Sequence, residues 1–219
     1  MRWVEIGLSY VSLWQISNFV DLLTIKQYIN HMESPEEIWR KMVEGEEYQA
    51  LHPHLIERLG KTREKIWEYN NLHPSCGAER EAMLRGLLGS VGERIQINQP
   101  FRCDFGSNIS VGDDFFANFN LTILDEAKVT FGDHVFIGPN VSIYTACHPL
   151  ESDRRNTCIE WAEPVTVGSN VWIGGSVTIL PGVTIGDNCV IGAGSVVSRS
   201  IPSGSVAVGN PARVIKRVE

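Results

Sequence analysis

The sequence predicts a mainly β protein, a left-handed parallel β-helix of hexapeptide repeats preceded by a small N-terminal helical region. Three observations in the second half of the chain lead to this prediction. Aliphatic residues recur every six positions, a glycine directly follows most of them, and a second apolar residue comes four positions later. The recurring positions are Val167, Ile173, Ile179, Ile185, Ile191 and Val197.

A six-residue period has a simple physical meaning. Each unit is one short strand and a turn, in which the aliphatic residue points inward and Gly, Asn or Asp takes up the unusual backbone angles of the corner. One unit cannot bury its own apolar face, so units stack, and three of them make a triangular coil of about 18 residues. The alternative is an antiparallel sheet rich in Gly-Asp turns, but such a sheet does not give six apolar positions at one fixed period.

The repeat extends upstream and is interrupted once. We expect the β-helix to occupy residues 95–219, including a C-terminal tail. Residues 145–166 carry no repeat and are expected to leave the coil as an excursion loop, which in a compact scaffold is usually functional or mobile. The upstream positions fall in two phases offset by two residues: Val111, Ala117, Ile123 and Val129, then Phe131, Ile137 and Ile143.

Residues 34–94 are expected to form the helical region. Ser34 offers an N-cap, followed by Pro35 at the first helical position and by Glu37 as a capping-box glutamate. Ser75 is expected to cap a third helix, which Gly89 ends. The apolar positions of the second and third helices are Leu55, Leu59, Ile66, Tyr69, Met83, Leu84, Leu87 and Leu88.

The first 33 residues are treated as an extension of the chain. Residues 6–20 are uncharged and largely apolar, but they are short for a membrane span and are followed by Asp21. The segment has neither a strongly basic start nor an A-x-A cleavage site, so a secretory signal is not expected. Two interpretations stay open, an amphipathic helix and an upstream extension before a functional start near Met32.

Composition narrows the classes of function. The formal net charge of −7 argues against a nucleic-acid binder, because neutralising phosphates needs a basic surface. The five cysteines are scattered without a CxxC pair, which is typical of free thiols in a reducing compartment. We therefore expect a cytoplasmic protein with neither nucleic-acid nor membrane partners.

His148 lies where the repeat stops and the excursion loop begins. There it can face a cleft between coil and loop and act as an acid or a base, while a histidine in a surface turn is the alternative. His134, in a Gly-Asp-His turn, is expected to be exposed to solvent. Three acidic residues on or beside the ladder become interesting if they converge with His148 at one rim, and they are otherwise simply solvated: Asp104, Asp125 and Glu126. Asn118 flanks Phe119 in a strand-like unit, and an asparagine that only turns a corner is the alternative.

The C-terminal end is locally basic. From residue 191 onward, the cations Arg199, Arg213, Lys216 and Arg217 are opposed only by Glu219. Such a cluster in an acidic chain suits an anionic ligand such as a phosphorylated cofactor, whereas a solvated tail is the alternative.

Longer segments of the chain carry a family resemblance. They include Phe-Arg-Cys-Asp-Phe-Gly (101–106), Ala-Asn-Phe-Asn-Leu-Thr-Ile-Leu-Asp (117–125), Tyr-Thr-Ala-Cys-His-Pro (144–149), Asn-Val-Trp-Ile-Gly-Gly (170–175) and Gly-Asn-Pro-Ala-Arg-Val-Ile-Lys (209–216). With these segments, residues 35–217 resemble the maltose, galactoside and nodulation-type sugar O-acetyltransferases, which are hexapeptide-repeat acyltransferases.

The resemblance implies an activity and a set of roles. The chain would transfer acetyl from acetyl-CoA, with no metal required, to a hydroxyl of a maltose-, glucose- or galactoside-like sugar. It would be a homotrimer in which neighbouring β-helices share each active site. His148 matches the general base, and an N–H near Gly175 is the candidate oxyanion donor. Acceptor-binding positions are matched by Asp104, Asn118, Asp125 and Glu126. Coenzyme A positions are matched by Trp172, Gly175, Ala193, Ser198, Arg199, Arg213 and Lys216.

The chain departs from the family pattern near Tyr48. The family usually carries an aspartate there that helps to hold the sugar, whereas Ala50 and His52 stand where an acid is expected. Gly175 replaces a serine found in some relatives, so only its backbone N–H can act. These departures leave the identity of the acceptor open and do not affect acetyl transfer itself.

Other functions are weighed against this one. The acceptor could instead be an amino sugar or a xenobiotic. A zinc enzyme resembling the γ-type carbonic anhydrases needs three histidine ligands from adjacent coils, and only His134 and His148 lie on the ladder or its rim. A non-catalytic β-helix module would need neither His148 nor coenzyme A.

Overall fold

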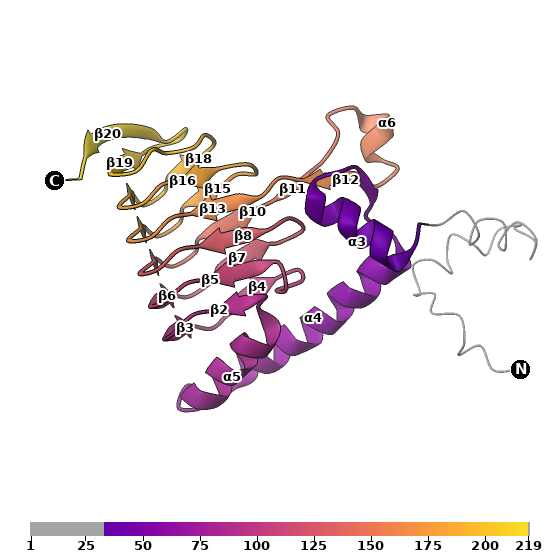
Figure 1. Cartoon of the computed structure of the whole chain (residues 1–219), viewed down its shortest axis with the longest axis horizontal. Helices are drawn as coiled ribbons and strands as arrows, with labels where there is room; N and C mark the ends of the chain where they lie inside the picture. Colours follow the sequence, from indigo (N-terminus) through magenta and orange to yellow (C-terminus); the bar gives the residue numbers. More distant parts are fainter. Residues whose placement is uncertain (1–32, 219) are drawn as a thin grey trace, which may run out of the picture.

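The computed structural model describes residues 33–218, which form a parallel β-helix with helices at one end (Figure 1). The mainly β prediction is confirmed. The predicted N-terminal extension lies outside the described residues apart from Glu33.

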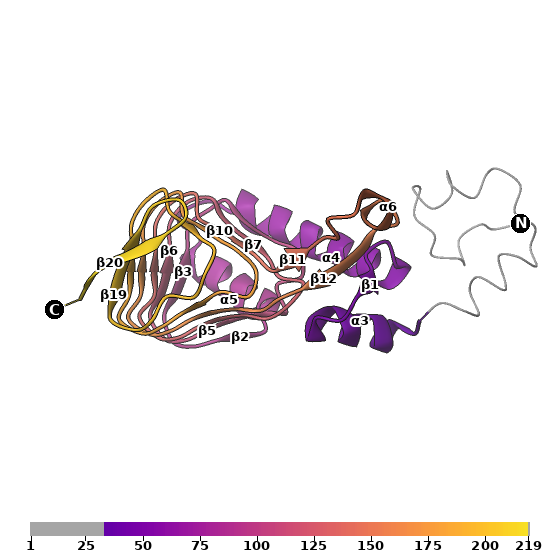
Figure 2. The ribbon, with the colours of Figure 1, turned by 90° about the horizontal axis from the view of Figure 1, so that it is seen from above.

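The β-helix has three faces, and its triangular section is visible from above (Figure 2). Face 1 contains β2 (Ser90–Val91), β5 (Ile109–Val111), β8 (Val129–Phe131), β13 (Val165–Val167) and β16 (Thr184–Ile185). Face 2 contains β3 (Ile95–Ile97), β6 (Phe115–Ala117), β9 (Phe136–Ile137), β14 (Trp172–Ile173), β17 (Val190–Ile191), β19 (Ser205–Val208) and β20 (Arg213–Arg217). Face 3 contains β4 (Phe101–Cys103), β7 (Leu121–Leu124), β10 (Ser142–Tyr144), β15 (Thr178–Ile179) and β18 (Val196–Val197). Neighbouring strands within a face run parallel, except that β20 folds back antiparallel on β19.

The predicted ladder forms the core. The six recurring positions from Val167 to Val197 are all at most 1% exposed, and the second apolar positions, such as Val171 and Val177, are buried as well. Ile173 pairs directly with Ile191 in the next coil, so identical side chains stack in columns. The six-residue period therefore predicts the inward-facing residues of this part correctly.

The first coils are longer than the sequence predicts. Late coils repeat after 18 residues, but Ile97 pairs with Ala117, so the early coils repeat after 20. The two additional residues lie between faces 3 and 1. Val129 and Phe131 are both buried in β8, so the change between the two repeat phases takes place within one strand.

Left-handed residues turn the corners. Asp114, His134, Asn170 and Asn188 occupy one corner in successive coils with φ between 53° and 57°. Asn and Asp tolerate this conformation better than most residues, as the repeat pattern predicts. Glycine is needed where coils approach most closely, because a Cβ at Gly174 would lie 2.6 Å from the backbone nitrogen of Ala193.

Three helices precede the coils: α3 (Pro35–Glu44), α4 (Pro53–Asn71) and α5 (Gly77–Leu87). Ser34 caps α3 as predicted, since its hydroxyl accepts the Glu37 N–H at 3.1 Å, but the Glu37 carboxylate pairs with Arg40 instead of closing a capping box. The predicted Ser75 cap is wrong. The cap residue of α5 is Cys76, and the Ser75 hydroxyl is bonded to His73.

Helices α4 and α5 close the open edge of the first coil (Figure 1). The side-chain amide of Asn70 accepts the N–H of Phe101 at 2.9 Å and donates to its carbonyl at 2.8 Å, and the Tyr69 hydroxyl donates to the Ile97 carbonyl. These bonds satisfy backbone groups that an exposed edge strand would leave free.

The excursion from the ladder has structure of its own. It contains β11 (Ala146–Cys147), α6 (Ser152–Arg155) and β12 (Ile159–Ala162), and the ladder resumes with β13 at Val165. Strand β12 also pairs antiparallel with β1 (Tyr48–Gln49), so α3 and the excursion lie side by side in both views (Figures 1 and 2).

Two corners matter below. We name residues 104–108, 125–128, 145–164, 180–183 and 198–200, between faces 3 and 1, the excursion corner. We name residues 118–120, 138–141, 174–177 and 192–195, between faces 2 and 3, the asparagine corner.

Candidate active site

The excursion corner gathers polar residues that are far apart in the sequence. Asp104 follows β4, Asp125 and Glu126 follow β7, and His148 follows β11. The register of face 3 stacks these strand ends in successive coils. Four of the residues singled out in the sequence therefore come to one edge of the molecule.

Asp125 is fully buried and holds the corner together. Its carboxylate accepts the backbone N–H groups of Asp104 at 3.0 Å, Phe105 at 2.9 Å and Asn108 at 3.4 Å. Burial raises the pKa of Asp125 to about 7, although these N–H donors oppose the rise. A side chain without exposed surface cannot touch an acceptor in this conformation. We therefore assign Asp125 to shaping the 104–108 turn and not to the predicted acceptor contact.

Glu126 lies at the wall of the same corner and is 9% exposed. Its Oε2 is 3.2 Å from the hydroxyl oxygen of Thr145. Burial, and next the nearby Asp104 carboxylate, raise the pKa of Glu126 to about 9. Asp104 and Glu126 thus form a pair of adjacent carboxyl groups at the rim.

His148 belongs to a chain of three polar side chains. Its Nδ1 is 3.5 Å from Oε1 of Glu160, and Oε2 of Glu160 accepts a 2.9 Å hydrogen bond from the Tyr48 hydroxyl. The side chains of His148 and Glu160 are 53% and 19% exposed. This contact is an ion pair when His148 is protonated, and it orients the ring so that the other nitrogen is left for a substrate.

Neither the role of Glu160 nor the polar role of Tyr48 is predicted from the sequence. The two residues are 112 positions apart and meet because β1 pairs with β12 in the register that sets Tyr48 opposite Glu160. No hexapeptide repeat marks either strand. The only signal was the charged, unpatterned loop itself.

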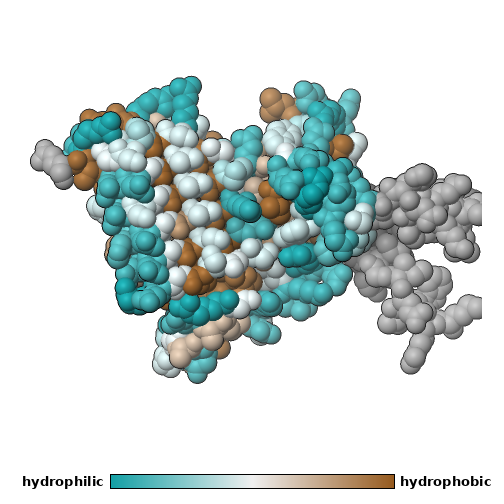
Figure 3. Space-filling view, in the orientation of Figure 1, coloured by the Kyte–Doolittle hydropathy of each residue, from teal (hydrophilic) through white to brown (hydrophobic). Residues whose placement is uncertain are grey.

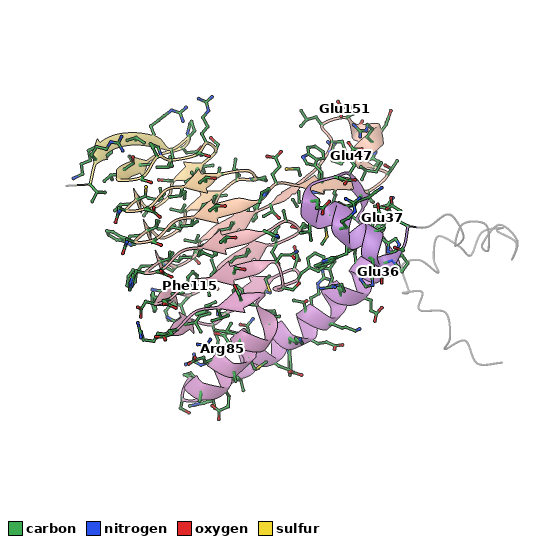
Figure 4. All side chains as sticks on the ribbon, viewed as in Figure 1. Glu36, Glu37, Glu47, Arg85, Phe115 and Glu151 are labelled. Atoms are coloured by element: carbon green, nitrogen blue, oxygen red, sulfur yellow. The ribbon has the colours of Figure 1, made fainter. Side chains whose placement is uncertain are left out.

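Two adjacent arginines fix the excursion in different ways. Arg155 donates to the carbonyls of Pro149 and Leu150, each at 3.1 Å, and so holds the turn that follows His148. Arg154 pairs with Glu47 at 2.6 Å across to the α3–β1 connection, and Figure 4 shows Glu47 close to the loop that carries Glu151.

His52, one of the two residues that stand where the acid is expected, has a structural role. His52 is buried and caps α4, with Nδ1 accepting the His54 N–H at 3.2 Å and Nε2 lying 3.1 Å from the Glu33 carbonyl. This imidazole performs the capping role for which aspartate is also favoured. His52 is therefore committed to the helix start.

Asn118 lies on the asparagine corner, not with His148. The strand between the two corners, β7, has four residues, which span about 13 Å when extended. One chain therefore does not bring Asn118 to the acidic pair.

The residues matched to coenzyme A positions are spread over face 2 and the two corners that border face 3. Gly175 and Ala193 stack in successive coils of the asparagine corner. Ser198 and Arg199 are exposed on the excursion corner, two coils beyond the loop. Arg213 and Lys216 are exposed on β20.

An apolar column runs along the outside of face 2. Its exposed members include Phe136, 52% exposed, and Trp172, 58% exposed, which pair in register. Phe119 on the neighbouring asparagine corner is 54% exposed. Figure 3 does not look onto this column; it shows another side of the coils, where brown and pale residues alternate, beside the largely polar helices and excursion. The column comprises Phe116, Phe136, Trp172, Val190 and Val206.

Residues 33–218 contain neither a metal-ligand cluster nor a membrane-spanning helix. No group of three or more His, Cys, Asp and Glu side chains there is arranged to hold a metal ion, so the zinc alternative has no ligand set in that range. None of the helices described is long and apolar enough to cross a membrane.

Comparisons with known proteins agree with this architecture. Residues 41–92 match the maltose acetyltransferase hexapeptide capping motif, and residues 164–199 match the bacterial transferase hexapeptide family (six repeats). The chain is 46% identical to the galactoside O-acetyltransferase of Escherichia coli, over 75% of this chain and 81% of the relative. It is 47% identical to nodulation protein L of Rhizobium meliloti, over 80% of this chain and 95% of the relative.

Solved structures give the same result. A maltose O-acetyltransferase from Clostridium difficile superposes with a TM-score of 0.82 at 49% identity, covering 83% of this chain and 97% of that one. A galactoside acetyltransferase in complex with coenzyme A gives 0.80 at 41% identity, covering 83% and 91%. A Vibrio cholerae hexapeptide-repeat acetyltransferase complexed with acetyl coenzyme A gives 0.78 at 36%, covering 85% and 100%.

Fold and similarity together define a hexapeptide-repeat acetyltransferase. The chain belongs to the maltose, galactoside and nodulation-type O-acetyltransferases, as its motifs predict, and it is an enzyme.

Proposed function

We propose that the protein transfers acetyl from acetyl-CoA to a hydroxyl group of a sugar, with His148 as general base. The observation that carries the proposal is the contact of His148 Nδ1 with Glu160. Glu160 accepts a hydrogen bond from Tyr48, which lies near the carboxyl groups of Asp104 and Glu126. Carboxyl groups accept hydrogen bonds from sugar hydroxyls, and the histidine supplies the base that such a poor nucleophile needs.

The reaction needs no covalent enzyme intermediate. The acceptor oxygen attacks the thioester carbonyl carbon while the free ring nitrogen of His148 takes the hydroxyl proton. Glu160 stabilises the imidazolium through Nδ1. A backbone N–H near Gly175 donates to the developing oxyanion. Because Gly175 lies on the asparagine corner, this donor would come from the neighbouring chain of a shared site. The C–S bond then breaks, and the sulfur leaves with the proton from His148, giving an acetyl ester and free coenzyme A.

We propose that coenzyme A lies against the later coils, in reach of face 2 and of the two corners that border face 3. Gly175 and Ala193 would contact it from the asparagine corner, beside Trp172. The exposed cations Arg199, Arg213 and Lys216, with Ser198, would meet its phosphates. Calorimetry with coenzyme A tests this placement. We expect saturable binding that weakens at least about 10-fold in Arg199→Ala, because a phosphate loses its charged partner.

We further propose a homotrimer whose neighbouring chains share each active site. Asn118 and His148 lie on different corners of one chain, so a complete acceptor site would take Asn118 from the neighbour. The exposed aromatic residues Phe119, Phe136 and Trp172 border the asparagine corner, and monomers rarely expose such apolar patches.

Mixed oligomers test the shared site. His148→Ala and Asn118→Ala chains would each be inactive alone. In randomly mixed trimers about a quarter of the sites combine an intact His148 with an intact Asn118 from the neighbour. Recovery of roughly that share of wild-type turnover supports a shared site, and no recovery contradicts it.

The acceptor is tested by assay. We propose a neutral sugar, and the acidic corner makes an amino sugar or a small xenobiotic amine the second candidate, since carboxylates also bind ammonium groups. Release of coenzyme A is measured over a panel of sugars, amino sugars and amines, and NMR of the product distinguishes an ester from an amide. Turnover confined to amines would overturn the sugar hydroxyl assignment. The five free thiols fit our proposal of a cytoplasmic setting.

A further inference from the structure

Glu126 is a buried acid in an acidic environment. The titratable groups around it are Asp104 in the coil before it, its neighbour Asp125, Tyr48 from β1 and Cys147 from β11. None of these groups is a cation, and Glu126 forms no ion pair within residues 33–218. Burying an unpaired carboxylate is strongly unfavourable, and such a group usually takes up a proton instead.

The hydrogen bonds around Thr145 lead to the same conclusion. Its hydroxyl oxygen accepts the Ala127 N–H at 3.0 Å and lies 2.8 Å from the Leu124 carbonyl and 3.2 Å from Oε2 of Glu126. A hydroxyl has one proton, so it can donate to only one of these two oxygens. The shorter distance favours Leu124. The contact with Glu126 is then a hydrogen bond only if Glu126 donates the proton.

We propose that Glu126 is an uncharged carboxylic acid at neutral pH and that the acceptor corner binds its substrate with one neutral acid and one carboxylate, Glu126 and Asp104. The inference rests on the proposed acceptor site and states how that site recognises its ligand. A neutral acid can donate a hydrogen bond to an acceptor oxygen, whereas two carboxylates can only accept. The pair therefore suits an uncharged polyol, which presents both hydroxyl protons and oxygen lone pairs.

Thermal unfolding tests the protonation state without any activity. A neutral Glu126 in the folded chain holds a proton that the unfolded chain releases above its ordinary pKa of 4.5. Wild-type stability from this group therefore falls as pH rises from about 5 to about 8, and Glu126→Gln lacks this loss. We expect the Tm of Glu126→Gln minus that of the wild type to increase with pH. The exposed control Glu151→Gln has no such trend. A difference that stays constant or decreases overturns the proposal.

Kinetics test the recognition step. With the sugar found in the panel assay, we expect Glu126→Ala to raise the acceptor KM about 10-fold or more, and Glu126→Gln to raise it several-fold less, since the amide still donates. Equal damage by both changes would overturn the role of Glu126 as a donor. Absence of acetyl transfer by the wild type would instead overturn the proposed function and leave the unfolding result standing.

Discussion

The ladder and the excursion corner are built on opposite principles. From β13 to β18 each coil has the same length, and the six recurring positions from Val167 to Val197 are aliphatic residues at most 1% exposed. The excursion corner instead buries Asp125, Glu126 and Thr145 and interrupts the coil with 20 residues, 145–164. The ladder repeats one six-residue unit, whereas the excursion contains no repeat.

This difference shows that the residues that stabilise the fold and the residues of the candidate active site lie in different regions of the chain. Burial of the stacked aliphatic columns stabilises the folded state, whereas buried acids destabilise it because they lose their contact with water. Strain and buried polar groups persist at functional sites only when the surrounding scaffold is stable enough to hold them. We infer that the ladder stabilises the fold and that the buried polar groups of the corner lower the free energy of unfolding by a smaller amount.

The largest expected effect lies in the ladder. Ile179→Ala removes a fully buried side chain from the column that joins Ile143 and Val197. Large-to-small changes at such sites cost about 2–5 kcal/mol of unfolding free energy because they leave a cavity. Urea unfolding measures the loss, and kcat per folded molecule should stay close to wild type. A loss below roughly 1 kcal/mol would contradict the division of roles.

A change at Glu160 should have the opposite effect: it should lower turnover and leave stability nearly unchanged. Glu160→Gln keeps an acceptor for the Tyr48 hydroxyl but removes the charge that faces His148 Nδ1. We expect kcat to fall about 10- to 100-fold, because the imidazolium formed in the reaction loses its stabilising partner, with little change in Tm. Glu151→Gln on the same loop serves as the control. Normal turnover in Glu160→Gln would remove this residue from the mechanism.

We expect the smallest effects from changes at the two arginines of the excursion, Arg154 and Arg155. Arg154 and Glu47 are both about half exposed, and such a pair contributes about 0–1 kcal/mol. Arg154→Ala should therefore leave stability and turnover nearly unchanged. Arg155→Ala removes both bonds to the turn after His148 and should lower kcat several-fold. Equal effects of the two changes would show that anchoring this turn does not matter.

The sequence predicts the ladder well because its cause is local and periodic. The inward positions, the corner residues Asp114 and Asn170, and the Ser34 cap all follow from short-range rules. The sequence leaves open whether Asp104, Glu126 and His148 converge at one rim, and the coil register decides it by stacking the strand ends that carry them. The 20-residue early coils were missed, although the phase offset between Val129 and Phe131 was their signal.

The remainder of the site depends on long-range pairing that no period encodes. Glu160 meets His148 and Tyr48 only through the β1–β12 register. The buried state of Asp125, which removes it from the predicted acceptor contacts, follows from three backbone N–H groups converging on it in the folded chain. Ser75 does not cap the helix, because its hydroxyl is hydrogen-bonded to the His73 ring instead.

The central claim is that His148 is the base, and one pair of variants tests it directly. His148 and His134 are almost equally exposed, at 53% and 55%, and each faces a carboxylate, but they lie on different corners. With saturating acetyl-CoA and the best acceptor of the panel, we predict that His148→Ala lowers kcat about 10²- to 10⁴-fold while His134→Ala stays close to wild type. Near-normal turnover in a folded His148→Ala protein would contradict the account.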